Sequence, residues 1–356
     1  MICMSMADQH PVKGKSRGIY NVSIALANEF MRRGVELRVL GNKDIATDIF
    51  NSTSSDVKFF NWVNGSQLGR IVWDQWKVYD AADACGADLL ILPKGYMSFL
   101  RRPKIKTLAY VHDVIIAHLA SKYPHMVSKA ETVYFTNSLR ATLKHADIIV
   151  TNSAFSRSEI LKWQRFQSLP SREIHVVGYG IPHNQSPDET NHSGVLLMLQ
   201  SPPYKLWNQT MAMIQKIAAL TVSDTKFTTV GSAPIGMVLP QGINWQHYGH
   251  VTRAQLTIHL KSSKVLVYSS EYEGFGIPPI EAIQAGVVPV YSNIPVLREV
   301  MGNAGFPFEN GNLQSLTIAL QSALATPLDT VVSWASALSA KHSIKQTVDR
   351  ITTLLK

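Results

Sequence analysis

The chain has 356 residues, of which 46% are hydrophobic and 17% are charged, so its composition excludes a disordered protein and suits about two globular domains. No apolar run reaches the roughly 18 residues of a membrane-spanning helix, and two cysteines are too few for a disulfide scaffold. The N-terminal residues lack the pattern of a signal peptide. We therefore expect a cytoplasmic protein.

The basic excess of the chain belongs to its first half. Residues 1–183 contain 23 Lys and Arg against 15 Asp and Glu, whereas residues 184–356 contain 11 against 10. A basic domain favours an anionic partner, which is a nucleic acid, an anionic membrane surface or a phosphorylated substrate. Charge alone does not choose among these partners.

Short apolar runs alternate with amphipathic segments in the first half. A strand at 2–6, a helix at 19–33 and a strand at 35–40 form a predicted βαβ unit, because the helix repeats apolar residues at spacings of three and four. Further strands are predicted at 89–92, 107–111, 148–151 and 174–177. The spacing between them suits parallel crossovers, which predicts one doubly wound sheet.

The same alternation returns after a polar, aperiodic stretch at 180–194, which is typical of a linker. Strands are predicted at 195–199, 227–230, 265–268 and 287–291, and helices at 208–220, 253–262 and 279–285. The sequence therefore predicts an α/β protein with a first Rossmann-like domain at 1–183 and a second at 184–340, facing each other across a cleft.

The segment 269–294 carries the strongest signal for a binding site. Gly274 and Gly276 permit close approach of the backbone, and two prolines after them start a short helix. Free N–H groups at that helix start favour a diphosphate. Glu273 and Glu281, with seven residues between them, are acceptors suited to sugar hydroxyls. The alternative interpretation is a capped crossover helix with a solvated acid.

This segment resembles the Glu-x7-Glu signature of retaining GT-B glycosyltransferases, particularly family 4, glycosyl transferases group 1. The resemblance covers nearly the whole chain, and it is strongest at 18–34, 111–113, 145–160, 174–182 and 248–251. It implies the GT-B fold, an acceptor-binding first domain, a nucleotide-sugar-binding second domain, and a final helix in 341–356 that crosses back to the first domain. It also implies transfer of a sugar from a nucleotide donor.

The resemblance also implies roles for individual residues. Glu281 would hold the donor ribose, while Glu273, Lys205 and His112 would form the catalytic site beside the donor sugar and diphosphate. The other positions implied to bind the donor are Phe275, Gly276 and Ile277 through their backbone, Gly18 at the first helix start, and Val251 near the base. Without the resemblance, Lys205 is an ordinary exposed lysine and His112 a satisfied histidine at a strand end.

The chain departs from the family pattern at one cation. The family has an Arg a few residues before the lysine, whereas this chain has Gln200 near that place. Gln carries no charge, so the diphosphate clamp is weaker or uses another cation, for which Arg17 is the candidate. The neighbouring GKS sequence lacks the glycine that a Walker A motif needs, which excludes ATP hydrolysis through that motif.

The predicted function is that of a retaining hexosyltransferase that moves glucose from UDP-glucose to a polysaccharide or a lipid-linked saccharide. No Asp-x-Asp pair or Cys/His cluster has metal-ligand spacing, so we expect metal independence and no cofactor besides the nucleotide-sugar substrate. The alternatives are a UDP-sugar epimerase or hydrolase on the same fold, a non-catalytic nucleotide-sugar-binding protein, and a nucleic-acid-binding module. The nearly neutral second domain argues against nucleic acid.

The basic segment 100–106 has four cations in seven residues. With Lys13, Lys15 and Arg17, it favours peripheral contact of the first domain with the anionic inner face of the membrane. The alternative interpretation is a solvated loop.

Overall fold

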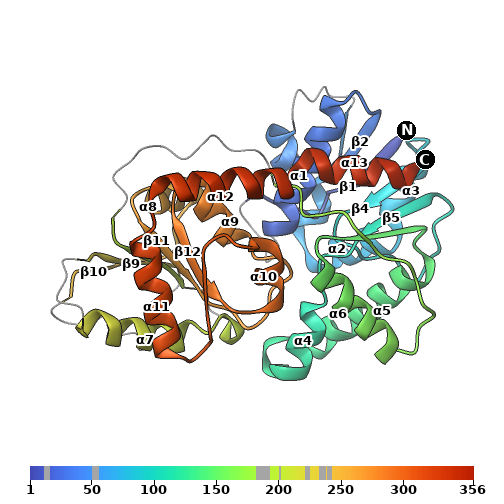
Figure 1. The fold of residues 1–356 in the computed structure, drawn as a ribbon. Coiled ribbons are helices and arrows are strands. Elements are labelled where there is room, and N and C mark those ends of the chain that lie inside the picture. The colour runs from blue at the N-terminus through green and yellow to red at the C-terminus, as the bar shows by residue number, and fades with distance from the viewer. Residues whose placement is uncertain are drawn as a thin grey trace. The chain divides into compact units, whose positions relative to one another are not determined.

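The computed structural model describes residues 1–11, 17–49, 56–181, 193–199, 202–220, 225–231, 238 and 243–356. Within these ranges the side chains of Arg17, Asn64, Ala219, Leu220 and Arg253 are not described. The chain divides into two compact units, Met1–Pro182 with His342–Lys356, and His183–Lys341. Figure 1 shows a sheet with helices around it in each unit.

The first unit contains a seven-stranded sheet in which every pair of neighbouring strands is parallel. The strand order is β3-β2-β1-β4-β5-β6-β7. The strands are β1 (Ile2–Ser5), β2 (Leu37–Gly41), β3 (Val57–Phe59), β4 (Leu89–Leu92), β5 (Lys106–Tyr110), β6 (Ile148–Thr151) and β7 (His175–Val176). The order reverses between β1 and β4, so loops after these two strands diverge to opposite faces of the sheet.

The helices of the first unit begin where capping side chains stand in the sequence. Ser128 accepts a hydrogen bond from the Glu131 N–H at the start of α5, and Ser153 accepts one from Ser156 at the start of α6. The α-helices are α1 (Arg17–Arg32), α2 (Gln67–Val72), α3 (Val78–Asp83), α4 (Ile115–Lys122), α5 (Lys129–His145), α6 (Ala154–Phe166) and α13 (Ile344–Leu355). Shorter turns are the 3-10 helices η1 (Lys43–Asp48), η2 (Asn61–Gly65) and η4 (Pro124–Met126), and the π-helix η3 (Trp73–Lys77).

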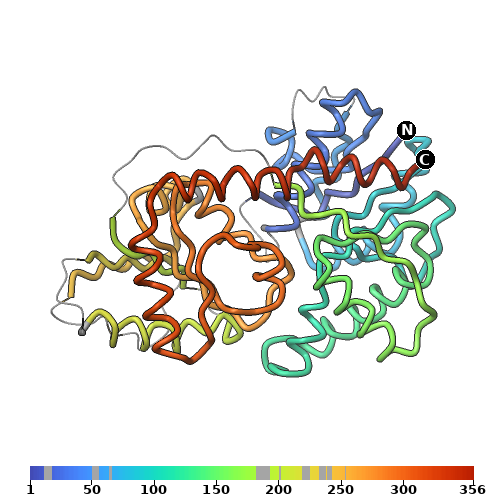
Figure 2. The backbone as a smooth tube through the Cα atoms, viewed as in Figure 1, coloured from blue at the N-terminus to red at the C-terminus, as the bar shows by residue number. Residues whose placement is uncertain are grey.

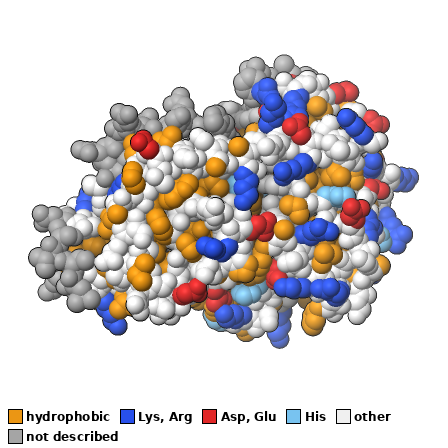
Figure 3. Space-filling view, in the orientation of Figure 1, with side chains coloured by type: hydrophobic (Ala, Val, Ile, Leu, Met, Phe, Trp, Pro, Cys, Tyr) orange, Lys and Arg blue, Asp and Glu red, His pale blue; other side chains and the backbone are white. Residues whose placement is uncertain are grey.

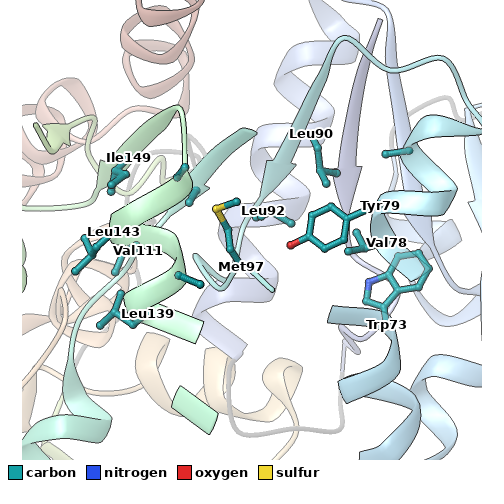
Figure 4. Packing of buried hydrophobic residues seen from close by; sticks show 14 of the residues in the cluster. Trp73, Val78, Tyr79, Leu90, Leu92, Met97, Val111, Leu139, Leu143 and Ile149 are labelled. Atoms are coloured by element: carbon teal, nitrogen blue, oxygen red, sulfur yellow. The ribbon is translucent and has the colours of Figure 1, made fainter. Parts of the chain in front are cut away.

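One large apolar cluster fills the space between this sheet and the helices α3 and α5 (Figure 4). Trp73 and Tyr79 pack beside Leu90 of β4, while Leu139 of α5 lies near Val111. Continuous apolar runs such as Leu89–Leu92 are buried at every position, as expected for a parallel strand covered on both faces.

The second unit repeats this architecture with a six-stranded parallel sheet of order β10-β9-β8-β11-β12-β13. Its strands are β8 (Val195–Leu199), β9 (Phe227–Gly231), β10 (Trp245–Tyr248), β11 (Val265–Tyr268), β12 (Val288–Ser292) and β13 (Phe306–Phe308). Its helices are η5 (Pro203–Lys205), α7 (Trp207–Leu220), α8 (Arg253–Lys261), α9 (Ile277–Gln284), α10 (Pro295–Met301), α11 (Leu313–Leu324) and α12 (Leu328–Lys341). Here the strand order reverses between β8 and β11.

The chain returns to the first unit at its C-terminus, where α13 packs against α1 (Figure 2). Arg33 bonds to the Asp349 carboxylate at 2.6 Å and to the Lys345 carbonyl at 2.8 Å. A short parallel bridge joins Ile181 to Ser343. The C-terminal helix is therefore part of the first unit's fold.

The two doubly wound parallel sheets predicted from the sequence are confirmed. The unpredicted strands β3, β10 and β13 lie at sheet edges, and they have three, four and three residues, which is too short for a clear alternating pattern. The unit boundaries fall at Pro182 and His342, beside the expected positions. Residues 182–192 of the expected linker lie outside the described residues.

Candidate active site

The second unit places Lys205 and Glu273 at the point where its strand order reverses. Lys205 ends η5, which follows β8, and Glu273 lies in the loop that follows β11. Strands β8 and β11 are neighbours, and both loops leave from their carboxyl ends. Open α/β sheets bind ligands at this switch point, because the loops diverge there and leave a crevice.

Lys205, Tyr268 and Glu273 form a buried triad at this position. The Lys205 Nζ lies 2.5 Å from Glu273 Oε1 and 3.0 Å from the Tyr268 hydroxyl, which donates a third bond of 2.7 Å to Glu273 Oε1. Lys205 and Glu273 are only 7% and 8% exposed. Buried charges of this kind persist when they are paired and hydrogen-bonded, as these are.

The backbone around the triad holds Lys205 in place. The Ser269 hydroxyl donates to the Lys205 carbonyl at 2.7 Å, and the Glu271 N–H donates to the Tyr204 carbonyl at 2.8 Å. The next residue, Leu206, has a left-handed backbone with φ of +52°. A non-glycine residue rarely adopts this conformation, and such strain is concentrated at functional sites.

The triad leaves two groups of opposite character for a ligand. The Lys205 ammonium has three N–H donors, and two of them face Glu273 and Tyr268. The third N–H and Glu273 Oε2 take part in none of these bonds, and the ammonium also lies 5.4 Å from the centre of the Tyr204 ring. Burial, followed by the Glu273 charge, holds the pKa of Tyr268 well above its usual value, so its hydroxyl keeps its proton.

The start of α9 lies directly after this triad in the chain. Gly276 has a φ of +90°, and a Cβ at this position would meet Leu297 Cδ2 at 2.1 Å. Phe275 is buried, Ile277 begins the helix, and Glu281 lies half-buried in its second turn. The prolines at the next two positions lack an N–H, so the donors that the helix start can offer to a phosphate are the backbone N–H groups of Gly276 and Ile277.

In the first unit, His112 is a buried, neutral histidine. Its Nε2 donates to the Pro93 carbonyl at 2.8 Å, and its ring stacks on Tyr110 with centroids 4.3 Å apart. Burial lowers the pKa of His112 to about 4. The imidazole is therefore uncharged at neutral pH, and a sugar contact is left to Nδ1 or to the backbone.

The structure describes only some of the remaining predicted positions. Gly18 lies in the first turn of α1, where its carbonyl accepts a hydrogen bond from Tyr179. Val251 is half-buried in the loop between β10 and α8. Gln200, Lys13 and Lys15 lie outside the described residues, as does the side chain of Arg17.

The described part of the chain contains neither a cluster of metal ligands nor a membrane-spanning helix. No group of three or more His, Cys, Asp or Glu residues there is placed to hold a metal ion. Among the same residues, no helix is both long and apolar enough to cross a membrane.

Sequence reasoning missed Tyr268 and a charged cluster in the first unit. Tyr268 ends the apolar run of β11 and looks like a core residue, and only its contact with two charges distinguishes it. In the first unit, Lys94 bonds to both Asp8 and Asp74, which are 66 residues apart in the chain. Neither pairing has a local sequence signal.

Comparison with known proteins places both units in one group. Residues 16–185 match the model of Glycosyltransferase Family 4, and residues 239–338 match that of Glycosyl transferases group 1. The fold matches Anabaena HepE in complex with UDP and glucose over 100% of this chain and 99% of that one, with a TM-score of 0.69 and 14% identity. Each model covers less than half of the chain, but together they match both units to glycosyltransferases, and the fold is the GT-B fold.

Other solved structures and curated sequences also resemble this chain. WaaG, a glycosyltransferase involved in lipopolysaccharide biosynthesis, matches over 99% of both chains with a TM-score of 0.68 and 13% identity. O-antigen chain mannosyltransferase B of Escherichia coli is 25% identical over 60% of this chain and 60% of its own length. O-antigen chain mannosyltransferase RfbU of Salmonella typhimurium is 24% identical over 54% and 55%. The chain thus spans less than two thirds of these curated relatives.

Proposed function

We propose that this GT-B glycosyltransferase moves a hexose from a nucleoside diphosphate sugar to a saccharide acceptor with retention of configuration. The observation that carries this proposal is the triad of Lys205, Tyr268 and Glu273. It offers a cation for a diphosphate and a carboxylate oxygen for a sugar hydroxyl at one switch point.

The triad suits the charge changes of this reaction. The bond from the anomeric carbon to the diphosphate oxygen breaks, and negative charge grows on the leaving diphosphate. The third N–H of Lys205 and the N–H groups at the start of α9 stabilise that charge. The acceptor oxygen bonds to the anomeric carbon on the same face, and its proton passes to the leaving diphosphate. These groups supply the stabilisation without a metal ion or a further cofactor.

The nature of the donor sugar rests on two different observations. The sequence predicts UDP-glucose, and the fold neighbour HepE has been solved with UDP and glucose. Both curated relatives compared above are named as mannosyltransferases, which favours mannose as the second candidate. Their names also support a polysaccharide or a lipid-linked saccharide as acceptor.

The first experiment is a thermal-shift titration of the whole chain with UDP, GDP, ADP, UDP-glucose and GDP-mannose, with and without EDTA. Ligands that bind the native state raise its melting temperature. We expect one nucleotide family to stabilise the protein equally with EDTA present. No response to any nucleotide would refute the proposal, and loss of the response in EDTA would refute metal independence.

Two variants then test the assigned roles. Lys205→Ala should lower kcat about 100-fold, because it removes the cation that meets the leaving charge. Glu281→Ala should mainly weaken nucleotide binding, by about tenfold. Unchanged kinetics in both variants would remove the site assignment. Donor consumption without an acceptor would favour the epimerase or hydrolase alternative.

A contact with anionic membranes is also part of this proposal. A surface pocket of about 350 Å³ is lined by Arg102, Arg140 and Lys144, with Leu100 beside them 57% exposed. Arg101 of the same segment is instead paired with Asp80 and Asp83. Lys and Arg side chains are also more frequent on the visible face of the first unit than on that of the second (Figure 3). Flotation with anionic and neutral vesicles tests the contact, and equal binding to both would refute it.

A further inference from the structure

A second group of charged residues lies at the switch point of the first sheet. Asp8 follows β1, and Lys94 follows β4. These neighbouring strands are the pair at which the strand order reverses. The position therefore corresponds, in the first unit, to that of Lys205 and Glu273 in the second, at an edge where parallel sheets bind ligands.

Lys94 links two buried carboxylates at this position. Its Nζ lies 2.5 Å from Asp8 Oδ2, and 2.9 and 2.8 Å from the two oxygens of Asp74. Although burial alone would lower it, the charges of Asp74 and Asp8 hold the pKa of Lys94 above its usual value. The ammonium therefore stays charged, and its three N–H donors all face these carboxylates.

Asp74 is already hydrogen-bonded to the protein at both of its oxygens. Both of its oxygens face Lys94, and the Tyr134 hydroxyl donates to Oδ2 at 3.0 Å. The Gln75 side chain in turn donates to Tyr134 at 3.3 Å. Burial, and then the Asp8 charge, raise the pKa of Asp74, while Lys94 lowers it. This side of the cluster is satisfied by the protein itself.

Asp8 differs from Asp74 in the hydrogen bonding of one oxygen. Its side chain is only 7% exposed, and its buried Oδ1 has no hydrogen-bond partner among the described residues. A buried carboxylate oxygen without a partner is costly, and native proteins rarely keep one without a purpose. Because a carboxylate only accepts hydrogen bonds, the missing partner is a donor such as a hydroxyl.

We propose that Asp8 Oδ1 accepts a hydroxyl of the saccharide acceptor, with Lys94 as the positioning residue that holds Asp8. This inference rests on the proposed function and names the residue of the first unit that would contact the acceptor. The cluster has two carboxylates for one ammonium whose donors are all used, so it repels a diphosphate. An uncharged, hydroxyl-bearing ligand meets no such repulsion.

The residues around this charged cluster also favour a ligand-binding site. Asp74 lies in the π-helix Trp73–Lys77, and π-helical turns occur frequently at functional sites. Trp73 donates its indole N–H to Ser5 of β1 at 3.0 Å. Trp62, which is 48% exposed, packs edge-on against Trp73 with ring centroids 6.4 Å apart. Exposed aromatic surface beside buried polar groups is typical of binding sites.

The test compares Asp8→Asn with Asp74→Asn in the whole chain. Each variant removes one negative charge from the same lysine. In Asp8→Asn, however, the amide oxygen turns to Lys94, which can only donate, so an NH₂ replaces the free acceptor. The probes are methyl α-D-glucopyranoside, methyl α-D-mannopyranoside and methyl N-acetyl-β-D-glucosaminide, and their affinities are measured by NMR titration with UDP or GDP present.

We expect the wild type to bind at least one glycoside. Asp8→Asn should weaken that binding about tenfold or more, whereas Asp74→Asn should change it less than about threefold. Nucleotide affinity should stay unchanged in both variants. Equal losses of glycoside affinity would assign Asp8 a structural role and overturn the proposal. Loss of nucleotide affinity in Asp8→Asn would also overturn it.

The melting temperatures of both variants serve as the control for folding, and Tyr134→Phe provides a milder disturbance of the cluster that leaves Asp8 intact. A tenfold loss in this variant would likewise count against Asp8. If the wild type binds a nucleotide but no glycoside up to the solubility limit, the inference fails and the proposed function stands. If it binds no nucleotide, the proposed function itself fails.

Discussion

Lys205 and Glu273 neutralise each other, and Tyr268 bonds to both. Under the proposed function, a donor that bonds to Lys205 and Glu273 would meet groups whose positions are already fixed by these contacts. Preorganised groups of this kind stabilise developing charge without reorganising during the reaction. The Tyr268 hydroxyl is the uncharged group of the triad, and it bonds to both charged side chains.

Tyr268→Phe should lower kcat about tenfold while it leaves nucleotide affinity nearly unchanged. The change removes one hydrogen bond from each charged partner, and bonds to charged groups contribute about 1.5–3 kcal/mol. The ion pair itself remains. Tyr291→Phe is the matched control, because Tyr291 is the buried register neighbour of Tyr268 on β12. Equal kinetics of the two variants in a steady-state assay would contradict the role of Tyr268.

His112 should make the first unit less stable as the pH falls from about 6.5 to 4. Its pKa is lowered to about 4 in the folded protein from an unfolded value of 6.5, so the unfolded chain binds the proton first. The stability lost over this window is roughly 3 kcal/mol. His112→Gln lacks this loss. Urea unfolding at several pH values should therefore show the wild type losing stability relative to His112→Gln as the pH falls through this window, and parallel curves would contradict the assignment.

At the scale of one element, α9 depends on the glycine before it. Gly276→Ala should destabilise the second unit by about 1–3 kcal/mol and weaken nucleotide binding, because φ is +90° and the new Cβ meets the buried Leu297. Gly249→Ala is the control for stability alone, since a Cβ there meets no atom within 4 Å. Thermal unfolding and nucleotide titration check both changes. A stable Gly276→Ala variant with full affinity would refute this account of the helix start.

At the scale of the whole molecule, the C-terminal helix is part of the first unit, although the chain reaches it only after the second. Val348 and Ile351 of α13 are 0% and 1% exposed, and Arg350 donates to the Val177 carbonyl at 3.2 Å. The helix thus completes the unit that contains the N-terminus. Each sheet keeps its own switch point with its own charged residues.

Ile351→Ala should lower the stability of the first unit by about 2–5 kcal/mol, because it leaves a cavity under α13. The second unit should keep its own melting transition. Calorimetry resolves the two transitions if the units unfold separately. Leu355→Ala is a control at a partly exposed position of the same helix. A first transition that does not move would contradict the docking of α13.

The sequence by itself determined the fold class and indicated the candidate site of the second unit. Apolar runs of four or five residues predicted the central strands, because those strands are buried on both faces. Gly276, Glu273 and Glu281 could be recognised from the sequence because they lie close together in the chain. The glycine indicates a tight turn, and the two acids have seven residues between them. Three short edge strands escaped prediction, since three or four half-exposed residues carry little pattern.

Only the tertiary structure decided which charges meet. The pairs Lys205 with Glu273 and Lys94 with Asp8 join residues that are 68 and 86 positions apart, and each pair comes together because two parallel strands are neighbours at a switch point. Burial is likewise a property of the packed molecule, and it sets the neutral state of His112 and the unpaired oxygen of Asp8. Sequence patterns report local periodicity, whereas such contacts arise from the order of strands in a sheet.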